Sequence, residues 1–217
     1  SEGAGSEAVS APESSAAAES TVTESTADTQ EAESTAAADT GEGRQFVVGF
    51  DAEFPPYGYK DGSGEYVGFD LDLAAEVCKR QGWELVKQPI DWDSKELELE
   101  TGRVDCLWNG LSITDERLAA MYFAKPYIAN KQIVIVPEGS EIKTVADLKG
   151  KRVGLQKGSS ALDALNANPV SKELTELVEL ADNVTVFSEL KAGRIDAFVV
   201  DEVVGRYLIS KDAEQAK

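Results

Sequence analysis

From Arg44 onward the sequence alternates short apolar runs with segments of helical periodicity, and this alternation constrains the fold more than any other feature. Residues 45–50, 131–136 and 195–200 are apolar runs of strand length. Residues 70–81 carry apolar side chains at helical spacing along one side, which predicts a helix. Strands that alternate with helices form mostly parallel sheets covered by helices. The pattern therefore predicts an α/β fold.

The alternation runs through two series. The first adds predicted strands over 66–69, 84–88 and 104–107, and helices over 94–101 and 115–121. The second adds a strand over 152–155, helices over 183–192 and 202–209, and helix starts at the capping boxes Thr144-x-x-Asp147 and Ser160-x-x-Asp163. Two series predict two lobes, residues 44–130 and 131–217, with a crossing near 127–133. Ligands of such folds bind between the lobes, beyond the carboxyl ends of the strands.

Residues 1–43 are of a different kind, almost entirely Ser, Ala, Glu, Thr and Gly without an aromatic residue. Such a segment cannot bury enough apolar surface to offset its conformational entropy, so we expect a disordered tether. A flexible coil of this length spans about 36 Å on average. The tether holds ten acidic residues and no basic one, which is more than half of the net charge of −19.

Composition excludes several classes of partner. The chain has no basic patch, which disfavours binding to nucleic acid or to an anionic lipid surface, and no apolar run of membrane-spanning length. The only methionine is Met121, so we expect a signal peptide, and a lipid-carrying cysteine that anchors the chain to the membrane, upstream of Ser1. Cys78 and Cys106 match no metal or redox motif, and their pattern fits two free thiols or one disulfide.

Residues 109–117 place polar groups between a predicted strand and a predicted helix. Ser112 or Thr114 can cap that helix, and Arg117 projects from its first turns. A helix N-terminus together with a guanidinium binds a carboxylate well. Alternatively, Arg117 forms a surface ion pair with an acidic neighbour in the same segment.

Two further loops carry polar groups at strand ends. In residues 156–160, Gly158 allows a close backbone approach and two serines lie at a helix start, which suits an anion or ordinary capping. Asp201 follows the apolar run 197–200, where its carboxylate can accept a ligand ammonium or cap the next helix. Together the three loops describe a zwitterion site. Arg117 and the helix starts bind an α-carboxylate and Asp201 binds an α-ammonium, so that each desolvated charge has a partner.

The runs GFDAEFPPY at 49–57 and GEYVGFDLDLA at 64–74 closely resemble the polar-amino-acid solute-binding family of bacterial ABC importers. The resemblance continues through residues 109–117, 148–154, 158–160 and 192–202, and it extends over about 44–215. It implies a type II periplasmic-binding-protein fold, in which two α/β lobes close on one amino acid. Members of the family usually continue past the equivalent of Lys217 to complete the first lobe, and that return is missing from this sequence.

The resemblance also implies roles for individual residues. Arg117 matches the carboxylate clamp and Asp201 the ammonium acceptor, while Asp51 matches a position that contacts a polar ligand side chain. Phe54 and Trp92 match apolar walls, for which a role as core aromatics is the alternative. The remaining matched or neighbouring positions contact the ligand backbone or line the same wall. The predicted ligand-binding set is Asp51, Phe54, Trp92, Asn109, Gly110, Ser112, Arg117, Gln156, Ser159, Ser160 and Asp201.

The resemblance therefore implies a monomeric extracytoplasmic receptor without catalytic residue, cofactor or metal. Its expected partners are a polar amino acid (glutamine, arginine, lysine or cystine) and the membrane permease of an ABC importer. The expected location is the outer face of the cytoplasmic membrane or the periplasm. One alternative is a dehydratase-type enzyme on the same fold, for which Glu53 can supply the acid or base because the chain has no histidine. A second is the ligand-sensing ectodomain of a signalling receptor.

Overall fold

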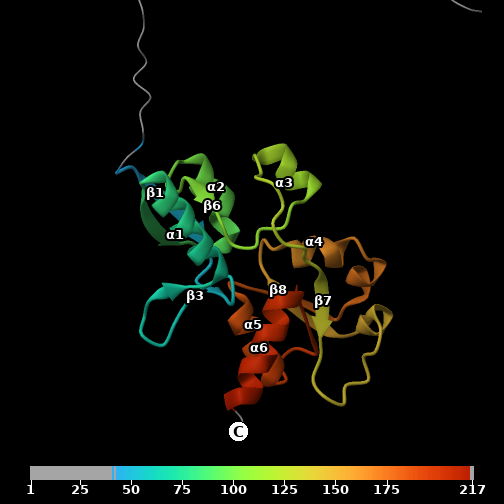
Figure 1. The fold of residues 1–217 in the computed structure, drawn as a ribbon. Coiled ribbons are helices and arrows are strands. Elements are labelled where there is room, and N and C mark those ends of the chain that lie inside the picture. The colour runs from blue at the N-terminus through green and yellow to red at the C-terminus, as the bar shows by residue number, and fades with distance from the viewer. Residues whose placement is uncertain (1–40, 42, 216–217) are drawn as a thin grey trace, which may run out of the picture. The chain divides into compact units, whose positions relative to one another are not determined.

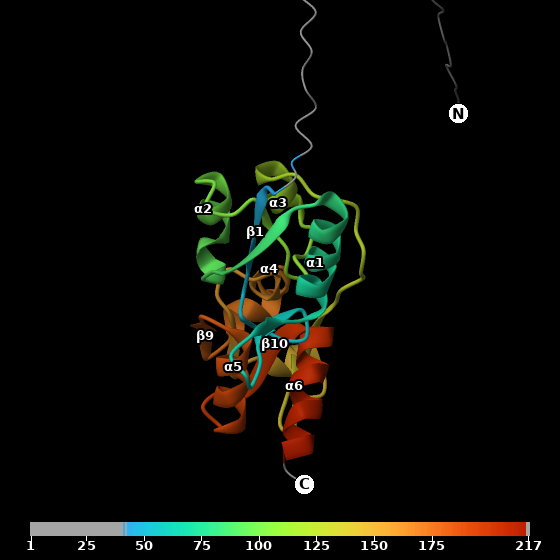
Figure 2. The ribbon, with the colours of Figure 1, turned by 60° about the vertical axis from the view of Figure 1, so that its left-hand side comes forward.

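The computed structural model describes residue 41 and residues 43–215. The predicted tether, apart from two glycines at its end, lies outside these residues. We call the elements from β1 to α3 the first lobe and those from β7 to α6 the second lobe (Figures 1 and 2). The chain is therefore two-lobed and α/β, as the sequence predicts.

The first lobe is built on a parallel sheet of three strands in the order β5-β1-β6, which are Glu84–Pro89, Gln45–Phe50 and Cys106–Leu107. Its helices are α1 (Phe69–Gln81), α2 (Lys95–Glu100) and α3 (Asp115–Ala120), with the 3-10 turn η1 (Trp92–Ser94) before α2. Leu71 and Ala74 of α1 pack on Val48 and Phe50 of the central strand. This contact buries the apolar side that the helical periodicity predicts.

The second lobe has a four-stranded sheet in the order β7-β10-β8-β9, which are Gln132–Ile135, Ala197–Asp201, Arg152–Gln156 and Glu176–Leu180. Its helices are α4 (Ser160–Asn166), α5 (Asn183–Lys191) and α6 (Glu202–Gln215), with 3-10 helices η2 (Val145–Leu148) and η3 (Pro169–Glu173). Phe198 and Val200 of β10 enter one apolar cluster, and Ala197 and Val199 enter the other. Successive side chains of a strand point to opposite faces, so β10 is buried on both.

The two lobes repeat one topology. β1, α1, β5, α2 and β6 follow one another as β8, α4, β9, α5 and β10 do, and the parallel strands lie in the corresponding orders β5-β1-β6 and β9-β8-β10. The lobes differ at one edge. In the second lobe the antiparallel strand β7 pairs with β10, whereas in the described residues β6 pairs only with β1.

A small antiparallel sheet of three short strands follows β1 directly: β2 (Glu53–Phe54), β3 (Gly58–Lys60) and β4 (Tyr66–Val67). Phe54 and Tyr57 belong to the same apolar cluster as Phe198 of β10. The ring of Tyr59 lies 6.1 Å from that of Tyr207 on α6. Apolar contacts therefore cross between the lobes, and the exact boundary at 130/131 stays a prediction.

Most predicted elements are present, and the differences have local causes. Phe69 begins α1 instead of ending a strand. The capping box at Thr144 forms, with the Asp147 carboxylate accepting from the Thr144 amide at 2.7 Å, but it opens a 3-10 helix. The prediction of a capping box at Ser160 is wrong, because α4 begins at that serine. The N-cap is Ser159, whose side chain makes no capping hydrogen bond to the helix. Sequence periodicity missed β9. It also missed β2 and β3, which have only two and three residues.

The two cysteines are free thiols, so no disulfide joins them. Burial raises the pKa of the Cys106 thiol to about 12, which keeps it protonated at neutral pH. Among the described residues no helix combines the length and the apolarity that a bilayer crossing requires.

Leu155 of β8 is fully buried and tests the second-lobe core. We expect Leu155→Ala to lower the free energy of unfolding by about 2–5 kcal/mol, since the packed sheet cannot collapse around the cavity. Leu97→Ala is the matched control, because Leu97 is 56% exposed and its truncation should change stability by less than about 0.5 kcal/mol. Urea unfolding followed by circular dichroism measures both. Equal effects would contradict the assignment of Leu155 to the core.

Candidate functional site

One small cavity between the lobes is lined by ten of the eleven predicted residues: Phe54, Trp92, Asn109, Gly110, Ser112, Arg117, Gln156, Ser159, Ser160 and Asp201. The eleventh, Asp51, is buried beside it and bonds to Gln156. The cavity volume is about 10 Å³, close to the space that one water needs. The predicted set is thus brought together, while the role of each residue in ligand binding stays a prediction.

Arg117 enters this cavity from the first turn of α3. The Thr114 hydroxyl accepts from the Arg117 amide at 3.2 Å and caps the helix. The guanidinium donates from Nη1 to the Ser112 carbonyl at 2.9 Å and from Nη2 to the Gly158 carbonyl at 3.4 Å. Within the described part of the chain it forms no salt bridge, so the alternative of a surface ion pair is not adopted. Burial lowers its pKa, and surrounding carboxylates including Asp201 oppose that shift.

Asp201 enters the cavity from the second lobe, at the carboxyl end of β10. Its Oδ1 accepts hydrogen bonds from the side-chain amides of Asn130 and Gln132. Burial raises the pKa of Asp201, while the two amide bonds and the positive charge of Arg117 lower it. The carboxylate is therefore engaged within the cleft by these amides.

Asn130 and Gln132 also bond to the serines on either side of the cleft. Asn130 Nδ2 donates to the Ser112 hydroxyl at 3.0 Å, and Gln132 Nε2 donates to the Ser160 hydroxyl at 3.1 Å. Sequence reasoning missed both amides. Gln132 lies opposite Asp201 only because β7 pairs with β10 in an antiparallel register, and the sequence contains no signal for that pairing.

A second polar group lies at the other end of the site, around Asp51. Gln156 Nε2 donates to Asp51 Oδ2 at 2.7 Å and to the Ala181 carbonyl at 2.9 Å, and Asn183 donates to Gln156 Oε1 at 2.9 Å. The bond between Gln156 and Asp51 joins the end of β8 to the residue that follows β1. Burial raises the pKa of Asp51 to about 6, and the negative charges of Asp182 and Glu53 also raise it. This end of the site is electrostatically negative.

Asp70, buried in α1, fixes the loop that follows β6. Its carboxylate accepts from the Gly110 amide at 2.5 Å and from the Tyr127 hydroxyl at 2.8 Å. Gly110 has φ +54°, and a Cβ there would lie 3.2 Å from the ring of Tyr57, so glycine is favoured for backbone conformation and for space. The loop that carries Ser112 is therefore held from the first-lobe core.

The two predicted aromatic walls also have structural roles. Phe54 stacks on Tyr57 with ring centroids 5.6 Å apart and belongs to the interlobe apolar cluster. Trp92 lies under the ammonium of Lys95, 5.3 Å from its ring centroid. Both rings line the cavity and pack as core side chains, so the two interpretations are compatible.

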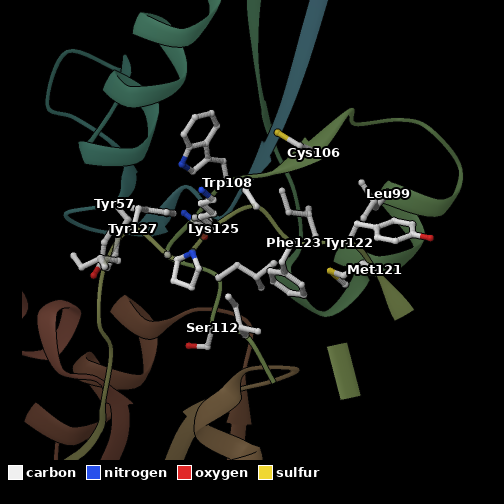
Figure 3. A pocket seen from close by; sticks show the side chains of 18 of the residues that line it. Tyr57, Leu99, Cys106, Trp108, Ser112, Met121, Tyr122, Phe123, Lys125 and Tyr127 are labelled. Carbon is white, nitrogen blue, oxygen red and sulfur yellow. The ribbon is translucent and has the colours of Figure 1, made fainter. Parts of the chain in front are cut away.

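A larger cavity of about 610 Å³ lies in the first lobe beside β6. Figure 3 shows Trp108, Met121 and Phe123 among its side chains. It shares Asn109, Gly110 and Ser112 with the predicted set but contains neither Arg117 nor Asp201. A zwitterion requires both charges, so its size alone does not make it the candidate site.

Comparisons with known proteins find similar sequences of curated function. The L-cystine-binding protein TcyJ of Escherichia coli is 32% identical over 76% of this chain and 62% of its own length. The lysine/arginine/ornithine-binding periplasmic protein of Escherichia coli is 36% identical over 72% and 60%. The histidine-binding periplasmic protein of Salmonella typhimurium is 35% identical over 78% and 65%. This chain thus spans less than two thirds of the length of these curated relatives.

Solved structures are also similar. A substrate-binding protein of an ABC uptake transporter from Streptococcus pneumoniae, with bound histidine, has a TM-score of 0.75 and 36% identity over 78% of this chain and 70% of its own. An ancestral arginine-binding protein bound to arginine has a TM-score of 0.74 and 35% identity over 78% and 75%. The family described as bacterial extracellular solute-binding proteins, family 3, matches residues 46–186, which is more than half of the sequence. The chain belongs to this family.

Proposed function

We propose that the chain is an extracytoplasmic receptor that closes its lobes on one amino acid with a cationic side chain and delivers it to the permease of an ABC importer. The observation that carries the proposal is the placement of two opposite charges, Arg117 and Asp201, from different lobes around one cavity. A zwitterion that pairs with both charges bridges the lobes.

Arg117 and Asp201 retain bonding capacity for such a ligand. A guanidinium has five N–H donors, and the contacts with Ser112 and Gly158 use only two of them. Both amide bonds to Asp201 end on Oδ1, which leaves Oδ2 to accept from an ammonium. We assign the α-carboxylate to Arg117 and the serine hydroxyls, and the α-ammonium to Asp201. Because α3 and α4 have only six and seven residues, we give their dipoles a smaller part than the sequence suggested.

The side-chain preference follows from the negative end of the site. Burial raises the pKa of Asp51 and of Glu53, and the negative charge of Asp182 raises both further, so a nearby cation would favour the ionised form of each. Arginine or lysine supplies such a cation at neutral pH, and histidine does so when its imidazole is protonated, whereas glutamine does not. The names of two relatives refer to binding of lysine, arginine and ornithine or of histidine. A third relative is named for cystine, whose second ammonium is the competing candidate.

Entry of the ligand requires the lobes to separate. The cavity of about 10 Å³ is far smaller than an amino acid, and groups from both lobes meet across it. A ligand that bonds to both lobes stabilises the closed arrangement over the open one, which is a hinge mechanism. We infer that the chain binds and releases its ligand without a chemical step. We therefore prefer the receptor function to that of a dehydratase-type enzyme. The lipid anchor upstream of Ser1 stays an expectation.

We expect Arg117→Ala to weaken amino-acid binding by at least about a hundredfold, since the ligand carboxylate would be desolvated without its partner. Isothermal titration with arginine, lysine, histidine, glutamine and cystine measures the loss. Arg206→Ala is the control, because Arg206 is exposed and pairs with Glu202 on α6. Retention of the parent affinity by Arg117→Ala would refute the clamp, and a parent that binds no amino acid would refute the receptor.

A pH profile tests Asp51. The pKa of its carboxyl is raised to about 6, so about one tenth is ionised at pH 5 and about nine tenths at pH 7. Because arginine keeps its charge over this range, its affinity should rise about tenfold from pH 5 to pH 7 and then level off. Asp51→Asn should bind arginine more weakly and with a flat profile. An affinity in the parent that falls with rising pH would contradict the pairing of Asp51 with a cation.

A further inference from the structure

Lys95 is a buried lysine that the proposed ligand contacts do not use. It begins α2 in the first lobe and is 3% exposed. A buried ammonium is costly unless its donors are satisfied, and it has three of them. Lys95 Nζ lies 3.0 Å from a Glu96 carboxylate oxygen, 3.3 Å from the Trp92 carbonyl and 2.9 Å from the Gly158 carbonyl. The first two partners belong to the first lobe, and the third belongs to the second lobe.

Two cationic side chains of the first lobe therefore donate hydrogen bonds to Gly158. Its carbonyl accepts from Lys95 and, at 3.4 Å, from Arg117. Beside it, Lys157 pairs with the Asp93 carboxylate at 2.7 Å. That pair is about half exposed on both sides, so solvent screens it, whereas the Lys95 side chain is buried and its bond to the half-buried Gly158 is screened less. The Lys95 bond is therefore the less exposed of the two contacts that side chains outside the proposed site make between this loop and the first lobe.

The backbone approach at this point is close. Gly158 has φ +65°, and a Cβ there would lie 3.0 Å from Asp93 Oδ1 and 3.2 Å from Asp93 Cα. Any larger residue would move residues 157–158 away from the start of α2. The absence of a side chain thus lets the Gly158 carbonyl reach the ammonium.

We propose that Lys95 is a positioning residue for ligand retention: it binds the loop before α4 only when the lobes are closed. The inference rests on the proposed function, since Ser159 and Ser160, assigned to the ligand carboxylate, follow directly on Gly158. When the lobes part, the bond from Lys95 to Gly158 breaks and the loop moves away with the second lobe. Lys95 therefore governs how fast the amino acid leaves, without contact to it.

The first experiment separates the rates of binding and release. Lys95→Met removes the charge and keeps the apolar stem that packs on Trp92, and stopped-flow kinetics with arginine should show a dissociation rate raised about tenfold at an association rate within about twofold of the parent. Lys149→Met is the control, because its exposed ion pair with Glu173 lies within the second lobe. Lys95→Arg, which keeps a cationic donor, should restore most of the slow release.

The second experiment needs no ligand. Hydrogen exchange of the full chain, read by mass spectrometry, should show faster exchange of residues 157–162 in Lys95→Met, with the sheet strands unchanged. Gly158→Ala tests the contact between Lys95 and Gly158 from the second lobe. It replaces Lys95→Met in the exchange experiment if that variant does not fold. Its control is Gly139→Ala, where φ is +78° and no atom lies within 4 Å of the added Cβ.

The outcomes are distinguishable. Faster release and faster local exchange in Lys95→Met, with the controls like the parent, support the positioning role. Unchanged release and unchanged exchange overturn it, and so does a loss of protection spread over both sheets, which indicates a merely structural lysine. If the parent binds no amino acid, the proposed function fails, and the exchange of residues 157–162 still decides whether Lys95 holds the loop.

Discussion

Arg117 and Asp201 carry opposite charges into a space that nearly excludes water, and the rest of the structure has to satisfy both. Arg117 is held by two carbonyls, one from each lobe, and Asp201 by the side-chain amides of Asn130, just before β7, and Gln132, the first residue of β7. An unpaired charge at such a place would be strongly destabilising. These contacts satisfy part of the bonding capacity of each charge, and the donors of Arg117 and the Oδ2 of Asp201 that they do not use are the groups that we assign to the ligand.

The repeated topology explains why these groups meet. In each lobe the parallel strands end at the cleft, so residues at or just after the carboxyl ends of β1, β6, β8 and β10 converge there. Asp51, Asn109, Gln156 and Asp201 all occupy such positions. The crossing segment adds the amide of Asn130, and the antiparallel strand β7 adds that of Gln132. The contact of Asp51 with Gln156 between the lobes is thus made by residues whose position in the fold is fixed by the sheets.

Much of the fold was predictable because it is recorded locally. The apolar runs of β1, β7 and β10 and the helical side of α1 appear within windows of a dozen residues or fewer. Elements without such a record were missed, as in β9, a sheet-edge strand of sequence ELVEL that has neither a continuous apolar run nor a regular alternation, and in the hairpin of β2 and β3. The capping box predicted at Ser160 failed because hydroxyl spacing cannot say which serine takes the cap.

The sequence by itself determined the fold class through its periodicity, and its motifs determined the resemblance to the family, which implied the eleven ligand-binding residues. Only the tertiary structure decided which groups satisfy Arg117 and Asp201, that Asn130 and Gln132 belong to the site, and that Lys95 reaches Gly158 in the other lobe. The physical reason is sequence distance: Lys95 and Gly158 lie 63 residues apart, and Gln132 and Asp201 lie 69 apart. No local pattern encodes such a pair, because its partners meet only after the sheets have formed and the lobes have packed together.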